Sequence, residues 1–327
     1  MSLLRRSCVV VSSSLVFVSA PISLTAHASP QIDSIRITSA ANVTLRVMPS
    51  PDAAAVAQLP LGTEVVEAGP AGLEKTWLRV RLADAREGWL QASLTRPLDP
   101  KWPWPVFDRI IADRLARKGD AFPGAAELVN FIERVAPEYT DPDGRGRIEF
   151  ARLRASSAAL SAVPFGAGRR EPYASWLAAR KNSVVYDEPG GRWMLRDEAV
   201  WDTHAAQSGT ESADAIGWFA VANGLWGECV GHLSCYLMGR NRLEGEYLRR
   251  HPFGTHAAEA VGVIKATADQ LMSALKPGTA YQFDKKNDCG GVTLAIDVLT
   301  AAAQGTRGAG RDDAISSLAA LRKICGP

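Results

Sequence analysis

The chain has 327 residues, of which 46% are hydrophobic and 22% are charged, and its formal net charge is +2 at pH 7. This length suits two domains, and this hydrophobic content is ample for packed cores. The near balance of basic and acidic residues argues against a protein that binds nucleic acid or a charged membrane surface, because such proteins carry an excess of positive charge on one face.

Residues 1–28 have the pattern of a secretory signal peptide. Two arginines precede an apolar run from Cys8 to Leu24, and Ala26-His27-Ala28 supplies the small residues of a cleavage site. A membrane anchor is the alternative, but the run contains serines and a proline and is short for a bilayer. We therefore expect a periplasmic or secreted protein with no transmembrane segment after cleavage. Removing both arginines leaves the 35 acidic residues matched by as many basic ones.

Residues 31–98 show the alternation of apolar and polar residues that is typical of short strands. Turns rich in glycine, proline and aspartate separate these strands, and this combination predicts a small all-β barrel. The predicted strands cover residues 35–37, 43–47, 64–68, 77–82 and 88–91.

The same segment resembles a bacterial SH3-like (SH3b) domain. The motifs that carry the resemblance are, in chain order, Asn42-Val43-Thr44-Leu45-Arg46, Pro49-Ser50-Pro51, Leu61-Gly62-Thr63, Trp77-Leu78-Arg79-Val80 and Gly88-Trp89-Leu90. The resemblance implies a non-catalytic module of exported bacterial proteins. Such modules often accompany cell-wall enzymes and hold peptidoglycan or another envelope partner.

Trp77 and Trp89 are the candidate binding residues of this segment, because an indole face stacks on sugar rings and on peptide prolines. Arg46 and Arg79 are candidates to meet a peptide carboxylate. The alternative, which we favour, is that both tryptophans fill the core, since small barrels routinely lodge such residues inside.

Residues 99–105 form a linker rich in proline and tryptophan, in which fixed φ angles and missing amides disfavour both a helix and a strand ladder. Residues 106–327 are predicted to be a mainly helical domain, because apolar residues recur at helical spacings. A small β-hairpin at 182–186 and 192–195 is expected among the helices. Residues 141–148 are interpreted as a turn, since their acidic residues lack the spacing of a calcium loop.

Three helices are predicted between Ala213 and Leu275. Asn223-Gly224 ends the first, His251-Pro252-Phe253-Gly254 ends the second, and Thr255 offers an N-cap oxygen to the third. The stretch 241–275 resembles one tetratricopeptide-like repeat of envelope proteins, but two further copies at a fixed period are missing from the sequence. A helical bundle and a short solenoid both fit this pattern.

Four cysteines remain after the predicted cleavage, at positions 229, 235, 289 and 325. In an oxidising compartment an even number of cysteines favours disulfides, and four cysteines allow three connectivities. We predict the local pairing, Cys229 with Cys235 and Cys289 with Cys325. A zinc site formed by Cys229, His232 and Cys235 is the alternative.

Two places in the helical domain are candidates for a local site. The first is the turn with Glu228 and His232, which the first predicted disulfide frames, and the second is the hinge with His251 and His256. We favour a structural interpretation, in which these residues belong to helix caps and packed turns. Since their spacing matches no metal-binding motif, we expect no metal and no cofactor.

A peptidoglycan hydrolase is the alternative to a binding protein. Residues 287–292 resemble the start of the catalytic helix of cell-wall cysteine peptidases, but no histidine follows Cys289 to activate its thiol. Glu228, Glu244 and Glu246 are candidate acids for glycan cleavage. The spacing of the last two to the arginines that follow favours ion pairs on the surface instead.

The sequence therefore favours an exported bacterial envelope protein that acts by binding, without catalysis, and a peptidoglycan-active hydrolase is the alternative. Its expected partner is peptidoglycan or an envelope protein, and not nucleic acid. The predicted architecture is a small all-β SH3-like barrel followed by a mainly α-helical, disulfide-bonded domain that contains a small β-hairpin.

Overall fold

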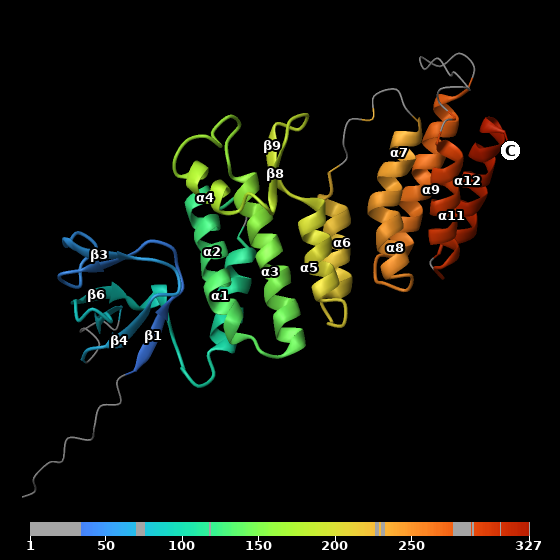
Figure 1. Cartoon of the computed structure of the whole chain (residues 1–327). Helices are drawn as coiled ribbons and strands as arrows, with labels where there is room; N and C mark the ends of the chain where they lie inside the picture. The colour runs from blue at the N-terminus through green and yellow to red at the C-terminus, as the bar shows by residue number, and fades with distance from the viewer. Residues whose placement is uncertain are drawn as a thin grey trace, which may run out of the picture. The chain divides into compact units, whose positions relative to one another are not determined.

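The computed structural model describes residues 34–69, 76–117, 119–225, 229, 233–276, 289, 291–307 and 309–326. The predicted signal peptide lies outside these residues. The described chain begins with β-strands and continues as helices that a single hairpin interrupts, as the colours of Figure 1 show. Within the described ranges, no helix is both long enough and apolar enough to cross a membrane.

Seven strands form one antiparallel sheet with the order β3-β2-β6-β5-β4-β1-β7. Five of them lie where alternation predicts strands, and the two edge strands, β3 and β7, are additional. Pro97 is the last residue of β7, where a proline is tolerated because one side of an edge strand forms no backbone hydrogen bonds within the sheet. The strands are β1 (Ile35–Thr38), β2 (Val43–Arg46), β3 (Ala55–Leu59), β4 (Glu64–Glu67), β5 (Trp77–Arg81), β6 (Glu87–Gln91) and β7 (Thr95–Pro97).

The core of the sheet is aliphatic. Its buried members are Val43, Leu45, Leu59, Val65, Leu78, Val80, Leu82 and Leu90. Gly88 lets β2 and β6 approach within this core, since a Cβ atom at position 88 would lie 2.7 Å from the carbonyl oxygen of Arg46 and 2.8 Å from Leu45 Cγ. A side chain at position 88 would therefore force the two strands apart.

The rest of the described chain is mainly helical, and the predicted hairpin is confirmed as β8 (Val184–Asp187) and β9 (Arg192–Leu195). A π-helical turn joins α7 to α8. The helices are α1 (Trp104–Leu115), α2 (Phe122–Val135), α3 (Pro142–Ser161), α4 (Tyr173–Ala179), α5 (Asp197–Ala206), α6 (Ala213–Asn223), α7 (Leu233–Arg240), the π-helix η3 (Asn241–Gly245), α8 (Glu246–Arg250), α9 (Ala257–Ala274), α11 (Val292–Gln304) and α12 (Arg311–Cys325), with short 3-10 turns η1 (Ala92–Leu94) and η2 (Ala136–Glu138).

Two helix starts differ from expectation because proline fits the first helical turn, where its missing amide breaks no bond. Helix α1 begins at Trp104 inside the predicted linker, and the indole of Trp104 donates to the carbonyl of Glu138 at 2.7 Å. Residues 141–148 are not a simple turn. Asp141 caps α3 by accepting the Gly144 amide at 2.6 Å, with Pro142 as the first helical residue.

The helices share two hydrophobic cores, and α6 contributes to both. Ile216 and Ala220 of α6 belong to the core of α1 to α5, whereas Val221 belongs to the core of α7 to α12. Figure 1 shows α1, α2 and α3 lying side by side, and also α9, α11 and α12. Helix α6 thus contributes to both helical groups, and Trp201 of α5 also packs against both cores.

A turn of the sheet packs on α2. The amide of Leu61 donates to Glu127 Oε1 at 2.5 Å, and Arg134 Nη2 donates to the carbonyl of Leu61 at 2.7 Å. Leu61 and Ile37 are buried in the same core as the first helices. Both backbone polar groups of Leu61 are therefore satisfied by charged side chains of α2, which fixes this turn strongly.

The predicted cysteine pairing is confirmed. Cys229 is bonded to Cys235, and Cys289 is bonded to Cys325. Two disulfides are consistent with a protein that folds outside the cytoplasm, where thiols are oxidised.

Replacing Cys289 and Cys325 together by serine is expected to lower the free energy of unfolding more than replacing Cys229 and Cys235. The first bridge spans a sequence separation of 36 and the second a separation of only 6. Because a longer loop removes more entropy from the unfolded chain, we expect losses of about 4 and about 2 kcal/mol. Urea denaturation followed by circular dichroism measures both, and equal losses would contradict this explanation.

Candidate functional site

The two tryptophans of the predicted SH3-like segment lie on the face of the sheet opposite its core. Trp77 and Trp89 are half-buried, whereas Leu78, Val80 and Leu90, which alternate with them along β5 and β6, are buried. Successive side chains of a strand point to opposite faces. The favoured expectation that both indoles fill the core is therefore wrong.

Two arginines flank Trp89 across the sheet. Arg46 on β2 is opposite Trp89 on one side, and Arg79 on β5 is opposite it on the other. Directly opposed residues share one face of a sheet. An Arg–Trp–Arg row therefore crosses three strands, and Trp77 lies on the same face, two residues before Arg79.

The arginines of this row are held in different ways. Arg46 Nη1 donates to the carbonyl of Ala53 at 2.6 Å, which uses one of the five guanidinium donors. Arg79 forms an exposed ion pair with Glu87 at 2.8 Å, and pairs of this kind contribute little because water competes for both charges. We call Arg46, Trp77, Arg79 and Trp89 the tryptophan–arginine face. It combines flat apolar surfaces with cations that can bind a carboxylate.

The predicted candidates of the helical domain divide into two pairs. Glu228 and His232 lie outside the described residues. His251 and His256 lie at the two ends of the hinge between α8 and α9, where α6 packs against them. The structure adds three residues that the sequence analysis did not single out, and we call the five together the histidine junction: His204, Asp214, Tyr247, His251 and His256.

Asp214 of α6 is the centre of the histidine junction. Its carboxylate accepts the hydroxyl of Tyr247 at 2.5 Å and the amide of Thr255 at 3.0 Å, and it lies 3.8 Å from His251 Nδ1. Burial on its own would raise the pKa of Asp214, but the hydrogen bonds to its carboxylate outweigh burial and hold this pKa below its usual range. Thr255 was expected to cap α9, and instead it binds Asp214 through its amide and its side chain.

Two imidazoles meet beside this carboxylate. His204 Nε2 lies 2.6 Å from His251 Nε2, and His204 is only 3% exposed. At this distance one ring donates a proton and the other must accept it, so both rings cannot be doubly protonated together. Gly217 of α6 gives them room, since a Cβ atom there would lie 3.1 Å from the ring of His251.

Burial, together with the neighbouring His251 and Arg250, lowers the pKa of His204 to about 4. Burial also lowers the pKa of His251, against the opposing influence of Asp214. Both rings are therefore neutral near pH 7. Because His204 is enclosed, a substrate does not reach it, and the arrangement serves to join α5, α6 and α8.

Glu244 differs from its predicted place on the surface. It is 3% exposed, and Arg240 Nη1 donates to its Oε1 atom at 2.6 Å. Its other oxygen, Oε2, is buried without a hydrogen-bond partner among the described residues, and burial raises the pKa of this carboxyl group. By contrast Glu246 pairs with both Arg249 and Arg250, as predicted.

The disulfides argue against two alternative roles of the cysteines, as zinc ligands and as a nucleophile. A zinc site at Cys229 and Cys235 needs thiolate ligands, and a nucleophile at Cys289 needs a free thiol. Since the sulfurs of all three residues are in disulfides, neither chemistry is open to them while these bonds are intact.

His204, Asp214 and Tyr247 escaped the sequence analysis because no local pattern links them. His204 and His251 are 47 residues apart, and Asp214 and Tyr247 are 33 apart. The one available signal was an unusual concentration of histidine and aromatic residues at helix ends.

The wild-type protein is expected to lose stability between about pH 6.5 and pH 4.5, and His204→Gln is expected to lose less. A lowered pKa in the folded state means that the unfolded chain binds a proton at position 204 first, so acid favours unfolding. The contribution of a shift of this size is about 3 kcal/mol. Urea denaturation across this pH window measures the difference.

The carboxylates do not produce the expected difference, because the wild type and His204→Gln carry the same ones. The pKa values of Asp214 and Glu246 are lowered, so their stabilising contributions are lost at and below the lower end of the window, and the raised pKa values of Asp197 and Glu244 affect both stability curves alike. Parallel stability curves for His204→Gln and the wild type would show that His204 is not the source of the acid sensitivity.

Comparisons of the chain with protein families, with curated proteins and with solved structures found no match.

Proposed function

We propose that this protein is an exported bacterial envelope protein that binds peptidoglycan, without catalysing a reaction, through the tryptophan–arginine face of its sheet. The observation that carries the proposal is the row of Arg46, Trp89 and Arg79 across three neighbouring strands, on the face that the core does not use. Peptidoglycan offers sugar rings beside peptide carboxylates, which are the two groups that this row is suited to bind.

The position of the motifs on the sheet supports the interpretation of this segment as an SH3-like module. Asn42 to Arg46 include β2, Trp77 to Val80 lie on β5, and Gly88 to Leu90 lie on β6. The central strands of the sheet thus carry the motifs of the resemblance. We infer from this that the sheet is a small SH3-like barrel, with the helices as a second domain.

Export is supported by the two disulfides and by the signal-like pattern of residues 1–28. Periplasmic and secreted proteins both meet these conditions. The protein partner that we weighed beside peptidoglycan would use the same face, because arginine and tryptophan are also frequent at the centres of protein interfaces.

The experiment must distinguish this binding protein from the alternative, a peptidoglycan hydrolase. It would need an acid such as Glu228 or a nucleophile such as Cys289 in the helical part. The bond between Cys289 and Cys325 disfavours the second of these.

Purified mature protein is expected to pellet with cell-wall sacculi. Trp89→Ala is expected to lower the affinity for sacculi about tenfold, since an anchoring aromatic residue contributes about 1.4 kcal/mol to the free energy of binding. Trp102→Ala is the control for the loss of an accessible indole elsewhere, because Trp102 is 63% exposed but lies outside the sheet. Sedimentation over a range of sacculus concentrations gives the affinities.

Soluble muropeptides released in the same tubes report on catalysis. Muropeptide release by the wild type that is lost in Glu228→Gln would establish a hydrolase instead of a binding protein. If Trp89→Ala pellets as well as the wild type, the tryptophan–arginine face has no role in binding.

A further inference from the structure

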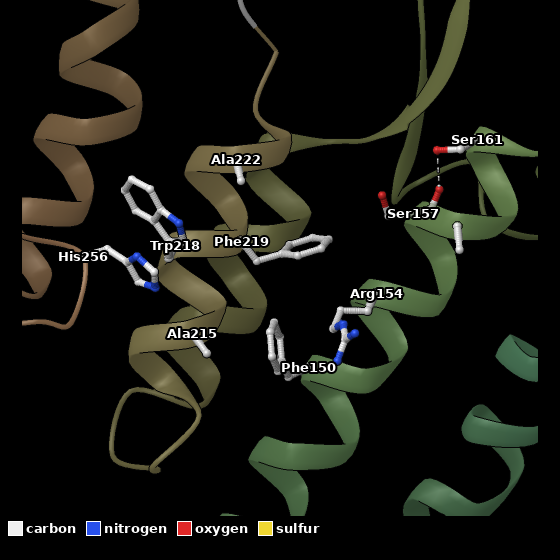
Figure 2. A pocket seen from close by; sticks show the side chains of 10 residues that line it. Phe150, Arg154, Ser157, Ser161, Ala215, Trp218, Phe219, Ala222 and His256 are labelled. Carbon is white, nitrogen blue, oxygen red and sulfur yellow. Dashed lines mark hydrogen bonds between the residues drawn. The ribbon is translucent and has the colours of Figure 1, made fainter. Parts of the chain in front are cut away.

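A second surface of the protein has the features of a binding site. Helices α3 and α6 form the walls of an open groove of about 440 Å³. Figure 2 shows Phe219 of α6 pointing toward Phe150 and Arg154 of α3, while Trp218 and His256 lie at the other side of α6. Most of the lining is carbon, from aromatic rings and alanines.

The side chains of the α6 wall are held by contacts with one another. The rings of Trp218 and His256 are stacked, with centroids 4.6 Å apart and planes 3° from parallel. His256 is held in turn, since its Nδ1 atom lies 3.1 Å from Glu259 Oε2 and its amide donates to the hydroxyl of Tyr247 at 3.1 Å. The indole is therefore presented in one orientation before any ligand arrives, which lowers the entropic cost of binding.

The wall at α3 supplies a cation. The guanidinium of Arg154 lies over the ring of Phe150, 5.8 Å from its centroid, and the ring of Phe150 meets the edge of Phe219 at 6.2 Å. Arg154 is exposed and has no carboxylate partner among the described residues, in contrast to Arg152, which pairs with Glu149. The residues that line the groove include no acid.

We propose that this groove binds a peptide segment whose apolar side chain lies on Trp218 and Phe219 and whose carboxylate pairs with Arg154. This site is separate from the tryptophan–arginine face and does not depend on it.

The chemistry of the lining favours an apolar carboxylate over a saccharide. A sugar ring needs several hydrogen-bond partners for its hydroxyl groups, but the two serines of the groove are already engaged. Ser161 donates to the carbonyl of Ser157 at 2.9 Å, and the hydroxyl of Ser157 lies 3.2 Å from Asn223 Oδ1. A guanidinium, by contrast, matches a carboxylate with two parallel hydrogen bonds.

Two small probes test this proposal. N-acetyl-phenylalanine carries the ring and the carboxylate, and N-acetyl-phenylalaninamide has the same ring without the charge. Nuclear magnetic resonance of the tryptophan indole N–H groups reports on the site, with the Trp218 signal assigned from Trp218→Phe. We expect the acid to shift that signal with a dissociation constant on the order of 1 mM and the amide to bind about tenfold more weakly.

The variants identify the source of this difference. Arg154→Gln is expected to bind the acid and the amide equally, whereas Arg145→Gln is the matched control and keeps the difference, because Arg145 is exposed on α3 but lines another pocket. Equal binding of both probes by the wild type, or no shift of the Trp218 signal, overturns the proposal. Preferential binding of N-acetylglucosamine or N-acetylmuramic acid at Trp218 overturns it as well, in favour of a saccharide site.

Discussion

The carboxylate of Asp214 is the contact on which the helical part of the protein depends. One side chain of α6 binds the hydroxyl of Tyr247 on α8 and the amide of Thr255 before α9, and it faces His251. A partly buried carboxylate needs such donors, since burial without them would neutralise it. The same contacts orient His256 and, through it, Trp218. A single acidic residue therefore links α6 to α8 and to the start of α9, and through Tyr247 and His256 it supports the position of Trp218 at the groove.

The two proposed binding surfaces are built by different means. The tryptophan–arginine face arises from strand register, because opposed residues on neighbouring strands are brought onto one face by backbone pairing alone. The groove between α3 and α6 arises from helix packing, and its aromatic wall is fixed by contacts from a third element. The first surface can be expected wherever the strands pair in this register, whereas the second depends on the contacts of Trp218 with Tyr247 and His256 of the histidine junction.

The sequence was informative where structure follows from local patterns. Alternation placed five strands, and helical spacing with Pro252 and Gly254 placed the hinge. Alternation also groups Trp77 with Arg79, but it does not say which of two faces is the core, and the bulk of the indoles suggested the wrong one. The aliphatic face forms the core because its side chains fill a small interior and bring no polar atom that would need a hydrogen-bond partner.

Contacts between distant residues lay beyond such reasoning. His204 meets His251 only because α5 and α8 pack on α6, and nothing within either segment encodes this. Glu244 is buried within a π-helical turn, where the α-helical spacing on which its predicted surface position rested does not apply. Asp141 was predicted to lie in a turn and instead caps a helix. Here the ambiguity is local, since an aspartate before proline fits a turn and a helix cap equally well.

Gly88 gives the tryptophan–arginine face a hidden dependence. Any larger residue there would press on the backbone of Arg46 and on Leu45. The gap between β2 and β6 would widen, and Arg46 would be carried away from Trp89 with every residue of the face still present. Absence of a side chain at one position is thus as much a part of this recognition surface as the indole and the guanidinium beside it, although it offers a ligand nothing to touch.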